Sequence, residues 1–130
     1  PFAAITEMFW PGPLSIVVPA GPDVPPDVAG GRGTVGIRGP GWALPRRLAA
    51  LLGRPITGVS ANLIGQPPCR TAAEVAQVFE AGIAMILDGG PSTGGAPSTV
   101  IDLTGPQPRV LREGAIPVSA LRPFLAGIRT

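Results

Sequence analysis

The chain of 130 residues contains no histidine, no tyrosine and no lysine, and its only cysteine is Cys69. Without histidine or lysine it cannot provide a histidine general base, histidine metal ligands, a Schiff-base lysine or the lysine of a Walker A loop. One cysteine excludes an internal disulfide and a site with several thiolate ligands. Because no histidine or lysine is present to activate the thiol, we expect Cys69 to be inert.

Charged residues are also scarce, at 14% against 45% hydrophobic residues. No apolar run reaches the roughly 18 to 20 residues of a membrane span, and the N-terminus lacks the pattern of a secretory signal. We therefore predict a single cytoplasmic domain with no membrane contact. All ten positive charges are arginines, and the net charge is +2. Guanidinium groups suit carboxylates and phosphates, which they can bind in a bidentate manner.

The 19 glycines and 18 prolines separate short apolar segments rather than forming low-complexity runs. Six segments are rich in β-branched residues and are flanked by turn residues, which predicts strands over residues 14–20, 34–38, 56–60, 83–88, 99–103 and 109–112. Helical patterns predict helices over residues 2–9, 43–52, 71–80 and 118–126. Together they predict an α/β fold, in which helices pack on a twisted mixed sheet.

Local signals add detail to this prediction. Thr71 and Glu74 have the spacing of a capping box at a helix start. The strands over residues 99–103 and 109–112 are close enough to form a hairpin. We expect residues 22–33 to form an exposed loop and residues 89–98 a flexible turn.

Two motifs resemble known signatures without meeting their requirements. Residues 31–36 match G-x-G-x-x-G but run into a predicted strand, whereas a dinucleotide fingerprint opens a helix. Ser60 lies in GVSAN, one residue away from a nucleophile elbow, and the chain has no histidine to activate it. Ser60 and Asn62 follow a predicted strand, where α/β sheets bind ligands. The alternative is that both side chains only satisfy backbone groups of a turn.

Arg38 and Arg112 each end a predicted strand. Such a charge needs an anionic partner, which can be a ligand or a structural ion pair. The glycine-rich stretch before Ser98 and Thr99 could form an anion-binding nest, or it could be a mobile loop.

Acidic residues at strand ends raise the question of a metal ion. Asp88 and Asp102 could help to hold Mg²⁺, but each also suits a turn at a strand end, which is the interpretation we favour.

Five segments together resemble, in order and approximate spacing, the YrdC/Sua5 family of threonylcarbamoyl-adenylate synthases. They are FWPGPLSIVVPA, TVGIRGP, GVSANLIGQPP, ILDGGPSTGGAPSTVIDLTG and PRVLREGAI. The resemblance implies an enzyme that joins L-threonine, bicarbonate or CO₂, and ATP into threonylcarbamoyl-AMP and pyrophosphate. The product would pass to t6A-transfer proteins that modify position 37 of tRNA, and Mg²⁺ could accompany the ATP.

The resemblance also implies roles for individual residues. The residues expected to bind threonine are Arg38, Gly58 and Ser98. Those expected to bind ATP are Thr34, Ser60, Asn62 and Arg112.

Members of this family carry a further N-terminal segment with a K-x-R motif, which this sequence does not contain. We therefore expect residues 1–130 to correspond to about the C-terminal two-thirds of a YrdC-like domain. An exposed sheet edge would then favour self-association, for example as a homodimer. Two alternatives remain open: a non-catalytic module that binds nucleotide or RNA, and the carbamoyl-adenylate domain of carbamoyltransferases.

Overall fold

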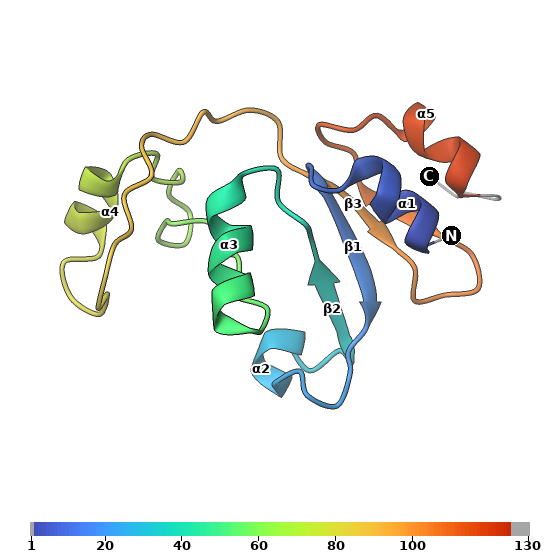
Figure 1. Cartoon of the computed structure of the whole chain (residues 1–130), viewed down its shortest axis with the longest axis horizontal. Coiled ribbons are helices and arrows are strands. Elements are labelled where there is room, and N and C mark those ends of the chain that lie inside the picture. The colour runs from blue at the N-terminus through green and yellow to red at the C-terminus, as the bar shows by residue number, and fades with distance from the viewer. Residues whose placement is uncertain (1, 126–130) are drawn as a thin grey trace. The chain divides into compact units, whose positions relative to one another are not determined.

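The computed structural model describes residues 2–125 (Figure 1). Within this range the chain forms two compact units. The first comprises residues 2–55 and 96–125 and is called the sheet unit below. The second is Ile56–Gly95 and is called the 56–95 unit. Each unit is described by itself.

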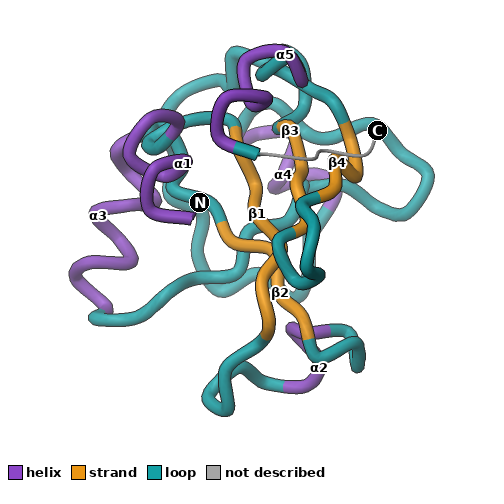
Figure 2. The backbone as a smooth tube through the Cα atoms, turned by 90° about the vertical axis from the view of Figure 1, so that its right-hand side faces the viewer, coloured by secondary structure: helices purple, strands orange, loops and turns teal. Residues whose placement is uncertain are grey.

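The sheet unit contains a four-stranded mixed sheet in the order β2-β1-β3-β4 (Figure 2). Strand β1 pairs antiparallel with β2 and parallel with β3, and β3 pairs antiparallel with β4. The β3–β4 pair confirms the predicted hairpin, and the mixed sheet with helices confirms the predicted α/β class. The strand bounds are Leu14–Pro19 (β1), Thr34–Ile37 (β2), Thr99–Asp102 (β3) and Arg109–Arg112 (β4).

One face of this sheet forms the hydrophobic core. Leu14, Ile16 and Ile101 are fully buried, whereas the alternate residues of β1 are only half-buried, as the two-residue period of a strand requires. Ile5 of α1 (Phe2–Phe9) and Leu121 of α5 (Val118–Leu121) also belong to the core. The two helices therefore cover the same face of the sheet and leave the other face less covered.

The other helices of the sheet unit are α2 (Pro26–Ala29) and α3 (Ala43–Leu52). The bounds of α1 and α3 are as predicted, whereas α2 lies inside the segment predicted to be a loop. The last helix was expected over residues 118–126, but after α5 the chain tightens into the 3₁₀ turn η1 (Arg122–Phe124), and Ala126 lies outside the described residues. Pro123 has no backbone N–H to continue an α-helix.

No helix within residues 2–125 is long and apolar enough to cross a membrane.

The G-x-G-x-x-G match leads into a strand, as predicted. Gly31 and Gly33 adopt φ values of 68° and 65° in the turn before β2. The backbone therefore uses these glycines for a turn and presents no helix N-terminus for a pyrophosphate.

The 56–95 unit differs from the prediction. Helix α4 (Ala72–Val78) begins after the predicted N-cap Thr71, whose Oγ1 accepts from Glu74 N at 3.2 Å. The strands predicted over residues 56–60 and 83–88 are wrong, because these segments join no sheet. A strand needs a hydrogen-bonding neighbour, and the four described strands pair only with one another. Apolar β-branched composition alone does not provide that neighbour.

Candidate functional site

Polar side chains gather at one end of the sheet. Because β1 and β3 are parallel and β2 and β4 run against them, β1 and β3 begin at the end where β2 and β4 finish. The residues at this end are Ser15, Arg38, Ser98 and Arg112, called the polar sheet end below. Three of them were predicted as site residues, and Ser15 was not.

Ser98 is the centre of a hydrogen-bond network. Arg112 donates from Nε and Nη2 to the Ser98 carbonyl oxygen, at 3.1 and 2.9 Å. Arg112 Nη2 also lies 3.3 Å from Ser98 Oγ, and Ser15 Oγ lies 3.0 Å from the same atom. The structure thus joins two hydroxyl groups and a guanidinium through one serine.

An irregularity in β4 places Arg112 in this network. Val100 pairs with Arg112, but the next residue of β3, Ile101, pairs with Val110. Leu111 is therefore an extra residue, and it is 54% exposed. In a regular strand Arg112 would share the core face with Val110, whereas the bulge places it with Val100 on the opposite face. Ser15 also pairs with Val100, so Ser15 and Arg112 lie on the same face of the sheet.

Arg38 lies on the other side of β1. It follows Ile37, which pairs with Ile16, and it precedes Gly39, whose carbonyl oxygen accepts from Gly12 N at 2.8 Å. These bonds hold Arg38 beside the start of β1, and strand alternation places it on the face of Ser15. The side chain is exposed and makes no hydrogen bond or ion pair with another residue of the described range. Its charge is therefore available to an anion.

Thr34 is not part of the polar sheet end. It is the first residue of β2 and pairs with Pro19, the last residue of β1. Arg38 lies four residue steps after Thr34, a distance of about 13 Å in extended chain. The structure thus places two of the predicted ligand-binding residues at opposite ends of the sheet.

Thr99 follows the glycine-rich stretch that could form an anion-binding nest, but its own side chain does not face a ligand. The side chain is fully buried. Its hydroxyl donates to Ile116 O at 2.6 Å and accepts from Gly114 N and Ile116 N at 2.9 and 3.0 Å. Its own N–H donates to Pro13 O at 3.0 Å. The hydroxyl and the N–H of Thr99 are therefore both used within the fold, where the hydroxyl fixes the segment after β4 against the start of β3.

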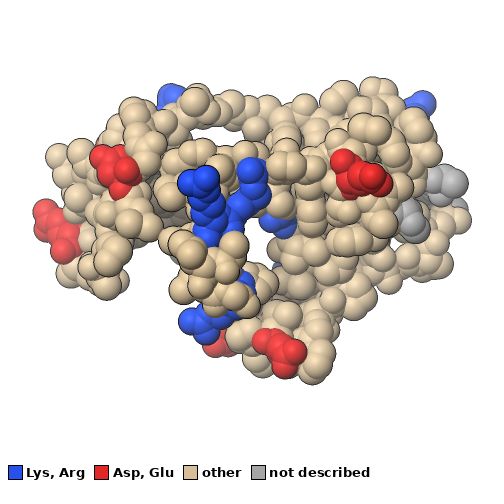
Figure 3. Space-filling model, viewed as in Figure 1, with Lys and Arg blue, Asp and Glu red and all other residues tan. Residues whose placement is uncertain are grey.

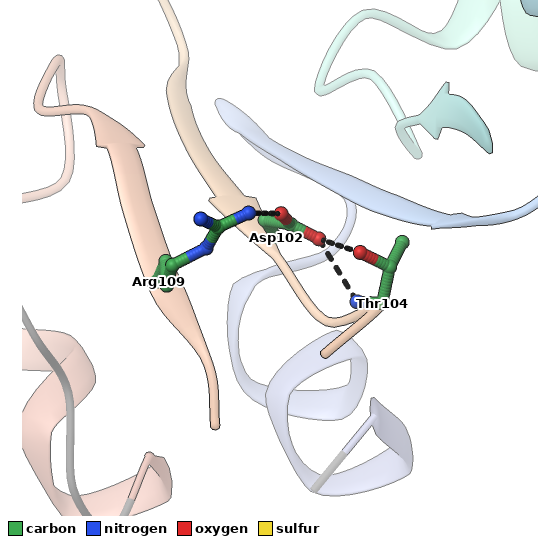
Figure 4. A network of polar contacts seen from close by, with 3 residues as sticks. All are labelled: Asp102, Thr104 and Arg109. Carbon is green, nitrogen blue, oxygen red and sulfur yellow. Dashed lines mark hydrogen bonds and ion pairs between the residues drawn. The ribbon is translucent and has the colours of Figure 1, made fainter. Parts of the chain in front are cut away.

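Asp102 stabilises the β3–β4 hairpin (Figure 4). Its Oδ1 accepts from Thr104 Oγ1 and Thr104 N at 2.6 and 2.9 Å, and its Oδ2 pairs with Arg109 Nη2 at 2.7 Å. The Thr104 hydrogen bonds, with a smaller effect of Arg109, lower the Asp102 pKa from 3.8 to about 2. These contacts agree with the turn interpretation rather than the metal one.

Asp88 also serves a turn, since its Oδ1 accepts from Gly90 N at 2.9 Å. Residues 2–125 contain no group of three or more acidic, cysteine or histidine residues placed to hold a metal ion.

Gly58, Ser60 and Asn62 lie in the 56–95 unit. All three belong to a stretch without helix or strand. The expectation that Gly58 lies in a strand, with Ser60 and Asn62 at its end, is therefore wrong. Asn62 Nδ2 donates to Leu63 O at 2.9 Å, as the turn alternative predicts. Asn62 Oδ1, however, is buried and has no hydrogen-bond partner among the described residues. Asn62 therefore satisfies a turn and still retains an unpaired acceptor.

Asn62 lines an open cleft of about 610 Å³ within the same unit. The size is within the range of small-molecule sites, roughly 300–1,000 Å³. Other lining residues include Gln66, Cys69, Arg70 and Gln77.

Sequence reasoning missed Arg70 as well as Ser15. Arg70 and Ser92 form reciprocal bonds: Ser92 N donates to Arg70 O at 2.7 Å, and Arg70 Nη2 donates to Ser92 O at 3.2 Å. Arg70 N also donates to Glu74 Oε2 at 2.6 Å. In a capping box, Glu74 would instead accept from the N–H of the N-cap residue Thr71. Arg70 thus holds part of the predicted flexible turn in place. The signal for Ser15 was present, since it is the one polar side chain in the strand LSIVVP.

Comparisons with known proteins give matches over most of the chain. The Sua5/YciO/YrdC family model, described as telomere recombination, matches residues 2–114. The threonylcarbamoyl-AMP synthase of Pyrococcus abyssi is 40% identical over 125 residues, which are 96% of this chain and 37% of that protein. The enzyme of the same name from Bacillus subtilis is 41% identical over 113 residues, covering 86% of this chain and 33% of that protein.

Solved structures show the same fold. The crystal structure of P. abyssi Sua5 complexed with L-threonine matches with a TM-score of 0.86 and 40% identity, covering 99% of this chain and 38% of that one. Escherichia coli YciO matches with a TM-score of 0.75 and 30% identity, covering 95% and 59%. The chain spans about a third of the length of the two curated relatives described above. Because the family model and these relatives cover most of its residues, the chain belongs to the Sua5/YciO/YrdC family.

Proposed function

We propose that this chain forms the L-threonine-binding surface, and part of the ATP-binding surface, of a threonylcarbamoyl-AMP synthase. The observation that carries the proposal is the polar sheet end, where Arg38 lies beside the Ser15–Ser98–Arg112 network. It occurs in a chain 40% identical to a threonylcarbamoyl-AMP synthase. The proposed reaction joins L-threonine, bicarbonate or CO₂, and ATP, and it releases pyrophosphate and threonylcarbamoyl-AMP for t6A formation in tRNA.

Arg38 is the group proposed to bind the threonine carboxylate. A guanidinium pairs with a carboxylate through two parallel hydrogen bonds, and the exposed Arg38 side chain has both available. Ser98 would donate its hydroxyl to the same ligand. For Gly58, which belongs to the 56–95 unit, threonine binding stays a prediction from the family resemblance.

Arg112 and Thr34 of the sheet unit are proposed to contact ATP. For Ser60 and Asn62 of the 56–95 unit, ATP binding stays a prediction from the family resemblance. Arg112 uses Nε and Nη2 on Ser98, and its Nη1 makes no hydrogen bond with a described residue, so Nη1 can reach a phosphate. The unpaired Asn62 Oδ1 suits a donor such as an amino group. Thr34 lies at the other end of the sheet from Arg112.

Catalysis by these residues would consist of alignment and charge stabilisation. The chain supplies no histidine or lysine to move protons. Holding the carbamate close to the α-phosphate and neutralising charge on phosphorus lowers the barrier without a general base. Mg²⁺ would bind mainly through the ATP phosphates, as it does in most nucleotide sites.

The reaction serves tRNA modification, so we propose that it takes place in the cytoplasm.

Calorimetric titration tests the proposal. L-threonine is titrated into the chain with saturating ATP, in the native protein and in Arg38→Ala and Arg38→Lys variants. Losing a charged bidentate pair should weaken threonine binding by about tenfold or more in Arg38→Ala, and Arg38→Lys should recover only part of it. A native protein without threonine-dependent heat, or an Arg38→Ala variant that binds as the native protein does, would overturn the proposal.

RNA binding is a second candidate because arginines gather around α3 (Figure 3). Arg47 and Arg54 are exposed, whereas Arg46 donates to Pro40 O and Gly41 O. The net charge of only +2 argues against it. An RNA affinity that falls steeply with salt would favour this candidate, and an affinity too weak to detect at low salt would exclude it.

A further inference from the structure

Ser15 has a single polar contact within the described residues, the 3.0 Å contact with Ser98 Oγ. No backbone group of the sheet depends on its hydroxyl. Its neighbours Leu14 and Ile16 are fully buried, so the backbone of β1 holds Ser15 in place between β2 and β3. A serine with this environment is not required to satisfy the fold, which raises the question of what its hydroxyl does.

Hydrogen-bond accounting at Ser98 gives an answer. A serine hydroxyl has one proton to donate and two lone pairs that accept. Arginine can only donate, so Ser98 Oγ accepts from Arg112 Nη2 at 3.3 Å. Of the two serines, either can donate to the other. If Ser98 donates to Ser15, its only proton is used within the network.

An anionic ligand decides between these two arrangements. A carboxylate can only accept, so Ser98 must turn its own proton toward it. Ser98 can do so while keeping both contacts only if Ser15 donates to Ser98 Oγ. Ser15 and Arg112 then fill both lone pairs, and two donors on one oxygen make the remaining proton a stronger donor.

We propose that Ser15 is a positioning residue that commits the Ser98 hydroxyl to donating toward the carboxylate of the bound amino acid. The inference rests on the proposed function and adds to it a residue that does not itself need to touch the ligand. Arg38, on the other side of Ser15, would bind the same carboxylate from β2.

The test compares Ser15→Ala, Ser15→Thr and the matched control Ser119→Ala, an exposed serine of α5. L-threonine and L-threonine methyl ester, in which a neutral ester replaces the carboxylate, are titrated into each protein with ATP. Losing one hydrogen bond should weaken L-threonine binding about fivefold to tenfold in Ser15→Ala and weaken ester binding less, because a neutral carbonyl accepts more weakly than a carboxylate. Ser15→Thr should restore native affinity, and Ser119→Ala should not change it.

A double-mutant cycle distinguishes positioning from a general structural effect. In a Ser98→Ala background, Ser15→Ala should cost no further affinity, because its effect passes through Ser98 Oγ. The thermal midpoint of Ser15→Ala should stay at the native value.

The outcomes separate the inference from the proposed function. If Arg38→Ala loses threonine binding while Ser15→Ala binds threonine as the native protein does, the role of Ser15 is wrong and the proposed function stands. Equal losses for L-threonine and its methyl ester in Ser15→Ala would also overturn the role of Ser15. A native protein that does not bind threonine overturns both.

Discussion

The sheet unit and the 56–95 unit contain similar apolar residues but use them differently. In the sheet unit seven hydrophobic residues are buried around one face of the sheet. In the 56–95 unit no residue is buried, and Val59 and Ile64 are 91% and 103% exposed. The difference is that each strand of the sheet unit pairs with another strand, whereas residues 56–60 and 83–88 of the 56–95 unit pair with no strand. Burial therefore follows pairing rather than hydrophobicity.

The difference in burial between the two units is tested most directly by truncating one isoleucine in each unit. Ile101→Ala should lower the free energy of unfolding by about 2–5 kcal/mol, because it opens a cavity in a fully buried position. Ile64→Ala should change it by no more than about 0.5 kcal/mol. Urea unfolding followed by circular dichroism measures both. Equal losses in the two variants would show that Ile64 is buried in solution.

A pair of glycines provides the second test. A Cβ on Gly114 would clash with Pro97 O and would lie 2.7 Å from Ser98 C and 2.8 Å from Ser98 O. Gly114→Ala should therefore destabilise the sheet unit by about 1–3 kcal/mol and displace Ser98 from Arg112. The control is Gly58→Ala, whose Cβ would meet nothing within 4 Å.

Unfolding is measured for both glycine variants, and threonine titration for Gly114→Ala. If Gly114→Ala is as stable as Gly58→Ala, Gly114 does not lie close to the Ser98 backbone in solution.

The smallest expected effect concerns pH. The Asp102 pKa is lowered in the folded state to about 2, so its contribution to stability is complete above about pH 4 and is lost as the pH falls through about 2. Asp102→Asn should remove the loss of stability that protonation of Asp102 causes at low pH. Thr104→Val should reduce that loss, because the Thr104 hydroxyl is the largest cause of the lowered Asp102 pKa. Unfolding midpoints measured between about pH 5 and 2 test this. An Asp102→Asn variant with the native pH profile would contradict it.

Local sequence signals succeeded where short-range chemistry decides the structure. The strand β1, the capping role of Thr71 and the β3–β4 hairpin were all predictable from neighbouring residues. The same signals failed for residues 56–60 and 83–88, because their composition suits a strand but says nothing about a partner. The extent of the domain over residues 1–130 stays a prediction.

The candidate site shows the same division. Arg38, Ser98 and Arg112 could be selected from the residues and the family resemblance, because guanidinium and hydroxyl groups at strand ends suit an anionic ligand. That Ser15 contacts Ser98, and that Thr34 lies at the far end, depends on strand order and register, which no local pattern specifies.

Composition alone determined what chemistry is open to this chain: arginine, serine and asparagine contacts, with no histidine or lysine to transfer protons. Tertiary structure decided which of these groups meet. The bulge at Leu111 turns Arg112 onto the face of Ser15, and the parallel pairing of β1 with β3 brings Ser15 to Ser98 across 83 positions of sequence. Such contacts depend on the pairing of distant strands, whereas residue type and local spacing act only over a few neighbouring positions.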